Sequence, residues 1–177
     1  MGMSRREEDV AKNMFTCSTH DAILIFTNMG KVFKLKGYQI PEASRTARGL
    51  PIVNLLNLDP DEKLANFTSI KSFEDENTHL VSVTKNGIVK RTHINEYQNI
   101  RQNGIIALTL REDDELILVR TTDNTKDIVL GSTNGKAIRF SEQDVRAMGR
   151  TASGVRGMTI EEGEAIIGAA IIDSNDD

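Results

Sequence analysis

Lysine and arginine side chains recur at a fixed distance from three glycines of the sequence. Each glycine closes a short polar turn, and the fourth residue after it is basic in every copy: Lys34, Arg91 and Arg139. Other basic residues lie closer to these glycines or in the loops beyond, and the full candidate set is Lys31, Lys34, Arg45, Arg48, Lys90, Arg91, Arg101, Lys136, Arg139, Arg146, Arg150 and Arg156. Ammonium and guanidinium groups bind phosphate through charge and hydrogen bonds. The pattern therefore predicts a polyanion-binding surface.

The charge of the chain is segregated along the sequence. The chain holds 22 basic and 26 acidic residues, a net charge of −4. The spans 30–49, 87–104 and 135–154 together hold 12 basic and 4 acidic residues, a net charge of +8, whereas the other 119 residues carry −12. Since a repeated element occupies an equivalent place in each repeat, we expect a basic band on an acidic surface, as in proteins that bind polyanions.

Two other roles are open to the same side chains. Lysines on exposed edge strands protect against aggregation, and some of the basic residues could brace neighbouring repeats through ion pairs with acidic turns. Because basic residues recur at the same position in all three repeats, ligand binding is favoured over these two roles. The six phenylalanines and two tyrosines mostly fall on apolar strands, which disfavours single-strand binding by base stacking. Contacts with the backbone of duplex DNA are favoured, and a curved rim of such contacts would bend the duplex.

Catalytic chemistry is not predicted. Cys17 and His20 lie close together in FTCSTHD, but a lone cysteine on an apolar strand is more often part of a core. The three histidines lack the spacing of a metal site, and the sequence holds no dinucleotide or phosphate-loop motif. The carboxylates gather in turns such as REDDE (111–115), which we interpret as solvated. We therefore expect no catalytic residue, metal site or cofactor.

The elements that carry the basic residues form a threefold repeat. The segments 23–37, 80–93 and 128–141 each contain an apolar run, a polar turn ending in glycine and a mixed apolar and basic run. Asn-Gly at 86–87 and 134–135 predicts type I′ hairpins, and Met-Gly at 29–30 is a weaker copy. A second glycine, an apolar stretch, an acidic turn and a last strand follow in each unit. Short helical turns are expected in INEYQNIR and SEQDVRAM.

About four strands per unit and a period near 50 residues predict an all-β, propeller-like array of about three blades. We divide the chain into a cloning remnant and lead-in (1–13), repeats of approximately 14–76, 77–122 and 123–173, and a tail (174–177). Propellers close with four to eight blades, so we expect a fragment of a larger protein or a chain that pairs with another copy. A single cysteine suits a reducing cytoplasm, and no apolar stretch is long enough to span a membrane.

Four long motifs carry a resemblance to a known family. They are STHDAILIFTNMGKVFKLK, YQIPEASRTARGLPIVNLL, NGIVKRTHINEY and GKAIRFSEQDVRAMGRTASGVRGM. In this order they resemble the C-terminal domain of DNA gyrase A, over nearly the whole chain from about Arg5 to Asp173. The corresponding domain of topoisomerase IV is the nearest alternative, and PEASRTARGLPIVNLL favours gyrase.

The resemblance implies a β-pinwheel, a six-bladed propeller whose blades exchange strands and whose basic perimeter wraps duplex DNA. It implies a non-catalytic module of an ATP-dependent type II topoisomerase that introduces negative supercoils, with the rest of gyrase A and gyrase B as partners, in the bacterial cytoplasm at the nucleoid. In this family ATP, Mg and the catalytic tyrosine belong to other regions, so Tyr38 and Tyr97 are given no catalytic role. By resemblance the matching basic positions contact DNA.

The chain departs from this family in having three repeats and no QRRGGKG-like basic box, which is associated with complete wrapping. Two readings from other classes compete with DNA wrapping. A protein-interaction propeller of the kelch or WD kind would show an apolar or mixed patch instead of a basic rim. A propeller enzyme would need convergent carboxylates or a metal cluster in its channel.

Overall fold

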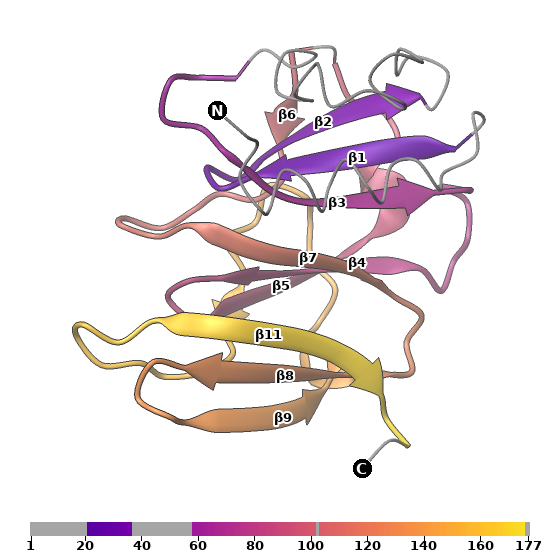
Figure 1. Cartoon of the computed structure of the whole chain (residues 1–177). Coiled ribbons are helices and arrows are strands. Elements are labelled where there is room, and N and C mark those ends of the chain that lie inside the picture. The colour runs from indigo at the N-terminus through magenta and orange to yellow at the C-terminus, as the bar shows by residue number, and fades with distance from the viewer. Residues whose placement is uncertain (1–20, 37–57, 102, 176–177) are drawn as a thin grey trace, which may run out of the picture.

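A computed structural model describes residues 21–36, 58–101 and 103–175. Within these residues the chain forms antiparallel strands, turns and two short 3₁₀ helices (Figure 1). The prediction of an all-β fold is confirmed. The residues Arg45 and Arg48, the Cys17 and His20 pair, and Tyr38 lie outside the described residues.

The first sheet has the strand order β3-β1-β2-β6. Its strands are β1 (Ala22–Thr27), β2 (Lys31–Lys36), β3 (Leu64–Ile70) and β6 (Ile105–Ile106). The two-residue strand β6 comes from the second repeat, and its register pairs Ile105 with Val32 and Ile106 with Lys31. The first sheet is therefore completed by a strand of the repeat that follows it.

The second sheet repeats this arrangement with the order β10-β5-β4-β7. Its strands are β4 (His79–Thr84), β5 (Ile88–His93), β7 (Leu116–Thr122) and β10 (Val155–Arg156). Strand β10 belongs to the third repeat and pairs with β5. The exchange of strands between blades, which the resemblance implied, is thus present at both junctions.

The third sheet has the order β11-β8-β9 and three strands among the described residues. They are β8 (Lys126–Ser132), β9 (Ala137–Ser141) and β11 (Ile166–Asp173). Figure 1 shows the three sheets stacked on one another, with β3, β7 and β11 along one edge of the stack. We call this the inner edge, because β7 contacts both β3 and β11 there. The opposite edge, which carries β6 and β10, is called the outer edge.

Hairpins form at all three turn glycines, but the prediction of type I′ turns was wrong. Asn86 and Asn134 lack the positive φ angle that a type I′ turn needs, and the N–H groups of Gly87 and Gly135 donate to the carbonyl oxygens of Thr84 and Ser132, as in a type I turn followed by a glycine bulge. Gly30, Gly87 and Gly135 have φ angles of 81°, 87° and 79°, which side chains other than glycine rarely adopt. The first two also contact the next repeat closely, because their carbonyl oxygens accept hydrogen bonds from the N–H groups of Ala107 (2.7 Å) and Gly157 (2.8 Å). The turns therefore fix the hairpins and the spacing between repeats.

Two apolar clusters fill the spaces between sheets. Leu24, Phe26 and Val32 of the first sheet pack against Leu80 and Val119 of the second. A second cluster joins Val81, Val83 and Val89 to Ile128 and Leu130 of the third sheet. Strand β4 thus buries side chains on both faces, with Leu80 in the first cluster and Val81 and Val83 in the second. The predicted helical turns are 3₁₀ helices, η3 (Ile94–Tyr97) and η4 (Glu142–Asp144), and they follow β5 and β9.

Candidate nucleic-acid interface

Two of the basic residues predicted to bind DNA are buried. The side chain of Lys90 lies on β5 with no exposed surface. Its Nζ donates hydrogen bonds to the carbonyl oxygens of Ala107 and Arg150. Burial lowers the pKa of Lys90 to about 7, although the Glu96 carboxylate favours the charged form. The ammonium group is therefore held inside the protein, where a DNA phosphate does not reach it.

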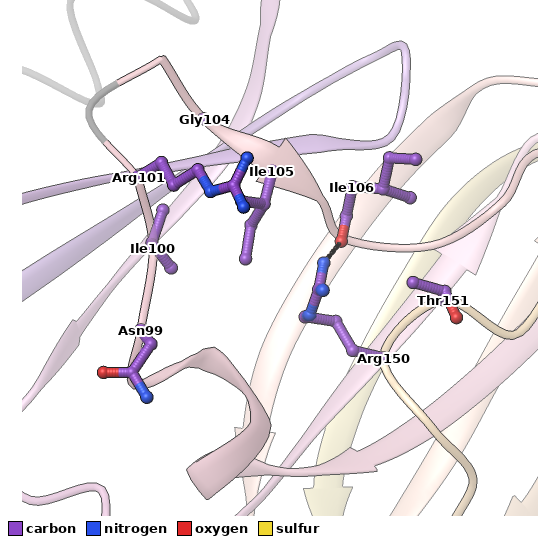
Figure 2. A pocket seen from close by; sticks show the side chains of 8 residues that line it. All are labelled: Asn99, Ile100, Arg101, Gly104, Ile105, Ile106, Arg150 and Thr151. Carbon is purple, nitrogen blue, oxygen red and sulfur yellow. Dashed lines mark hydrogen bonds between the residues drawn. The ribbon is translucent and has the colours of Figure 1, made fainter.

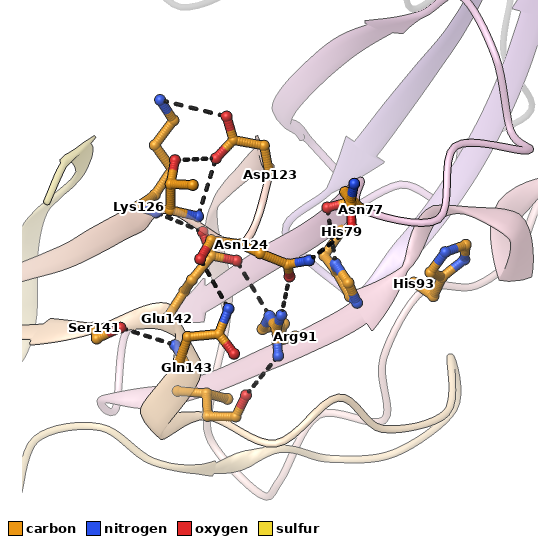
Figure 3. Close-up of polar contacts among 12 residues, drawn as sticks. Asn77, His79, Arg91, His93, Asp123, Asn124, Lys126, Ser141, Glu142 and Gln143 are labelled. Carbon is orange, nitrogen blue, oxygen red and sulfur yellow. Dashed lines mark hydrogen bonds and ion pairs between the residues drawn. The ribbon is translucent and has the colours of Figure 1, made fainter.

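Arg91, the neighbour of Lys90, points to the opposite face of β5 and joins the second sheet to the third repeat (Figure 3). Its Nε lies 3.2 Å from Oε1 of Glu142, a fully buried carboxylate. Its other nitrogens donate to the carbonyl oxygen of Val145 at 3.2 Å and to Oδ1 of Asn124. Since every branch of the guanidinium contacts the next repeat, Arg91 braces two blades.

Lys34 occupies the same position in the first repeat and makes a similar contact. Its Nζ donates to the carbonyl oxygen of Gln98 (2.8 Å), directly after η3, and lies 5.1 Å from the centre of the Phe73 ring. Burial, with the Lys36 charge nearby, lowers its pKa. Lys34 and Arg91 therefore both reach the 3₁₀ helix of the following repeat. This contact supports the bracing role that the sequence left open.

The third copy of this position is Arg139, which contacts its own repeat. Its Nε donates to Oδ2 of Asp127 at 2.8 Å, and Nη2 donates to the carbonyl oxygen of Ser174 at 3.2 Å. The side chain keeps about a third of its surface exposed. Among the described residues it meets no following repeat, so it turns back to its own sheet.

A second group of basic residues is exposed. Arg101, Arg146 and Arg156 lie on the surface, and the described residues offer their side chains no hydrogen bond or ion pair. Arg156 is part of the outer strand β10, and Arg101 precedes the outer strand β6. Arg146 follows η4. These guanidinium groups are available for a ligand.

The remaining two predicted lysines are intermediate cases. Lys31 is partly buried on β2, with Nζ 5.4 Å from the centre of the Phe33 ring. Lys136 is half-exposed and lies 3.7 Å and 3.9 Å from carboxylate oxygens of Glu164 and Glu161. Neither ammonium group is buried, so both could add charge to the interface.

A groove of about 750 Å³ lies at the outer edge. Figure 2 shows Arg101 on one side of it and Arg150 on another, with β6 between them. Arg150 is half-buried, and its Nη1 donates to the carbonyl oxygen of Ile106. The residues that line the groove are Asn99, Ile100, Arg101, Gly104, Ile105, Ile106, Arg150 and Thr151. The structure therefore brings together two arginines that are 49 residues apart in the sequence.

Carboxylates of the acidic turns have a structural role that the sequence interpretation missed. Glu62 accepts a hydrogen bond from Oγ1 of Thr27 at 2.6 Å, and Glu164 accepts one from Oγ of Ser132 at 2.8 Å. Both carboxylates are buried. Bonds from the Glu161 N–H and from Ser132 lower the pKa of Glu164. Thr27 and Ser132 each lie three residues before a turn glycine, and this recurring hydroxyl residue was the sequence signal that could have predicted the buried carboxylates. These carboxylates are not solvated, and they tie the hairpin turns to the inner strands.

Within the described part of the chain no cluster of three or more histidine, cysteine, aspartate or glutamate side chains could hold a metal ion. The same residues contain no helix long and apolar enough to span a membrane.

Successive repeats that exchange an outer strand, with free arginines along that edge, define a propeller-type repeat domain. The sequence profile described as "DNA gyrase C-terminal domain, beta-propeller" matches residues 21–71, 78–123 and 126–173. The chain belongs to this family, and the resemblance inferred from its motifs is confirmed.

Curated relatives agree with this assignment. The DNA gyrase A protein of Staphylococcus epidermidis is 45% identical over 173 residues, which cover 98% of this chain and 19% of that protein. The gyrase A protein of Staphylococcus aureus strain NCTC 8325 is 45% identical over 174 residues. The chain thus spans about a fifth of the length of these relatives.

Solved structures show the same fold. The C-terminal domain of DNA topoisomerase IV matches with a TM-score of 0.82 and 30% identity, over 98% of this chain and 58% of that one. The DNA gyrase A C-terminal domain matches with a TM-score of 0.69 and 23% identity, over 88% of this chain and 49% of that one. The β-pinwheel fold is therefore shared with both proteins.

Proposed function

We propose that this chain is a DNA-binding and DNA-wrapping module of a gyrase A protein, and that it holds duplex DNA against its outer edge. The observation that carries this proposal is the group of exposed arginines without protein partners among the described residues: Arg101, Arg146 and Arg156. Guanidinium groups on a surface displace condensed counterions from a duplex without reading its sequence. Lys31, Lys136 and Arg150 add charge to the same interface.

The arrangement of the sheets supports wrapping in addition to binding. The outer strands β6 and β10 belong to successive sheets of one stack, so a duplex that follows this edge meets equivalent elements in turn. A series of phosphate contacts on one side favours bending of the duplex toward the protein. In the complete enzyme the bent duplex would be presented to the catalytic regions of gyrase A and gyrase B, which would use ATP to introduce negative supercoils.

Direct measurement of binding tests this function. Fluorescence anisotropy with a 40-base-pair duplex of mixed sequence should show log K falling linearly with log salt, with a slope of about −0.9 for each phosphate contacted. Ligation of a nicked plasmid in the presence of the protein should shift the linking number if the duplex is wrapped. The proposal would be contradicted if the folded protein did not bind the duplex, or if its affinity for the duplex did not depend on salt concentration.

The equivalent domain of topoisomerase IV is the second candidate, because its solved structure matches 98% of this chain. The 45% identity to gyrase A proteins favours gyrase. The plasmid assay tests the wrapping part of the proposal, since a shift in linking number is expected from a wrapping module.

A further inference from the structure

We propose that the groove between residues 99–101 and 104–106 on one side and the loop at Arg150 and Thr151 on the other binds a single phosphate of the DNA backbone, with Arg101 and Arg150 as its two cationic donors. This inference rests on the proposed function and assigns one phosphate-binding position within the interface. The groove lies beside β6, the outer strand of the first sheet. A duplex held on the outer edge passes it directly.

The charge in the groove favours an anion. Two arginines line it and no aspartate or glutamate does. Glu96 lies next to the groove without lining it, and its Oε1 accepts a hydrogen bond from the backbone N–H of Arg150 at 2.9 Å. A guanidinium has five N–H donors, and Arg150 uses one nitrogen on the carbonyl oxygen of Ile106. Its other donors, and all those of Arg101, have no partner among the described residues.

The walls of the groove are held together from behind. The buried Nζ of Lys90 donates to Ala107, directly after β6, and also to Arg150 on the facing loop. A second tie runs from Oγ1 of Thr109 to the carbonyl oxygen of Thr151 at 2.6 Å. Because these bonds connect the two walls without using the lining arginine donors, the groove is formed before a ligand arrives. Lys90 is a positioning residue for this site.

One wall of the groove is also fixed by the turn that carries Arg101. The N–H of Gly104 donates to the carbonyl oxygen of Arg101 at 2.8 Å. Gly104 has a φ angle of 82°, and a Cβ there would lie 2.9 Å from the ring of Phe33. A side chain at this position is therefore excluded, and the backbone packs against the first sheet with Arg101 projecting from the turn.

The lining suits a phosphodiester better than a base. No aromatic side chain lines the groove, so it offers no stacking surface. Ile106 lies beside the two arginines with 54% of its surface exposed. An exposed aliphatic group next to two guanidinium groups matches a sugar next to its phosphate. The expected contact is therefore independent of DNA sequence.

Arg101→Ala tests the site, with Arg120→Ala as the matched control. Arg120 is also exposed but lies on β7 at the inner edge, where its Nη1 donates to Asn66. With the 40-base-pair duplex, Arg101→Ala should weaken binding about tenfold at low salt and reduce the salt slope by about 0.9, the value for one phosphate. Arg120→Ala should leave both unchanged, and Arg101→Lys should restore most of the slope.

A second measurement locates the contact. In ¹⁵N-labelled protein titrated with a 12-base-pair duplex, the amide resonances of Gly104, Ile106 and Thr151 should shift, whereas that of Gly131 in the third sheet should not. If the parent binds the duplex with a salt slope but Arg101→Ala behaves like the parent and these amides do not move, the groove is not a phosphate site and the proposed function stands. If the parent shows no salt-dependent binding, the proposed function itself fails and this inference fails with it.

Discussion

The first two sheets differ from the third in what completes them. Strands β6 and β10 of the following repeats close the first and second sheets, whereas the third has no strand beside β9 among the described residues. A Cβ added at Gly87 would lie 2.5 Å from the carbonyl oxygen of Met158, but one added at Gly135 would meet nothing within 4 Å. Equivalent residues of one repeated sequence therefore have different roles, because different neighbours surround them.

The largest effect is expected when the basic residue four places after the turn glycine is replaced. The loss of stability should differ between the second sheet, where this residue is Arg91, and the third, where it is Arg139. Arg91→Ala leaves the buried Glu142 without its cation, which costs about 3–5 kcal/mol. Arg139→Ala removes a partly exposed pair with Asp127 and should cost about 1 kcal/mol or less. Urea unfolding of the two variants measures both values. Equal losses would contradict the assignment of Arg91 as an inter-blade brace.

The buried lysine of the second sheet should make stability depend on pH. The folded pKa of Lys90 is about 7, below its ordinary value of 10.5, so the unfolded chain binds more protons between these values. Stability should therefore rise with pH in this window, by about 2 kcal/mol between pH 7 and pH 9. The third repeat has Ile138 at the equivalent position. Lys90→Met should remove this rise in urea unfolding followed at several pH values, and an unchanged rise would exclude Lys90 as its source.

Alanine at the turn glycines should sharpen the comparison further. Gly87→Ala and Gly135→Ala both force a side chain into a positive φ, which costs about 1–2 kcal/mol. Only the first also meets the backbone of the next repeat. We expect Gly87→Ala to be the more destabilising by about 1 kcal/mol or more in thermal unfolding. If the two variants unfolded at the same temperature, the contact between repeats would not contribute this stability.

The smallest effect is expected at the rim of the third sheet. Lys136 is half-exposed, and its distances to Glu161 and Glu164 are 3.9 Å and 3.7 Å. Pairs of this kind contribute about 0–1 kcal/mol. Lys136→Ala should therefore change the free energy of unfolding by less than about 1 kcal/mol, and urea unfolding at low and high salt checks this. A larger decrease in the free energy of unfolding would show that Lys136 has a structural role like that of Arg91.

The sequence predicted the local structure well because its turns are specified locally. Asn86-Gly87 and Asn134-Gly135 define hairpins within a few residues, and the apolar runs define the strands between them. The exchanged strands β6 and β10 have two residues each, so no alternation reveals their partners. Their exchange was implied by the resemblance to the family and not by the residue pattern.

The sequence pattern did not show which basic residues join neighbouring repeats and which are exposed to a ligand. Lys90 is buried because its acceptors come from residues 17 and 60 positions away, and such partners are visible only in the folded chain. Arg91 and Arg156 both follow a glycine in a mixed apolar and basic run, yet one is buried and the other exposed. The basic band is thus partly a set of inter-blade contacts.

Two triple variants that lose the same charge at opposite edges test whether the outer edge binds DNA. Arg101→Ala/Arg146→Ala/Arg156→Ala removes free cations from the outer edge and its flanking loops, and Lys63→Ala/Lys71→Ala/Arg120→Ala removes exposed cations at or next to the inner strands β3 and β7. Duplex affinity across a salt series is measured for both variants, with urea unfolding as the check on folding. The outer variant should lose about 2.7 of the salt slope with little change in stability, while the inner variant should bind like the parent. Equal loss of affinity in both variants would show that net charge, and not the outer edge, determines DNA binding.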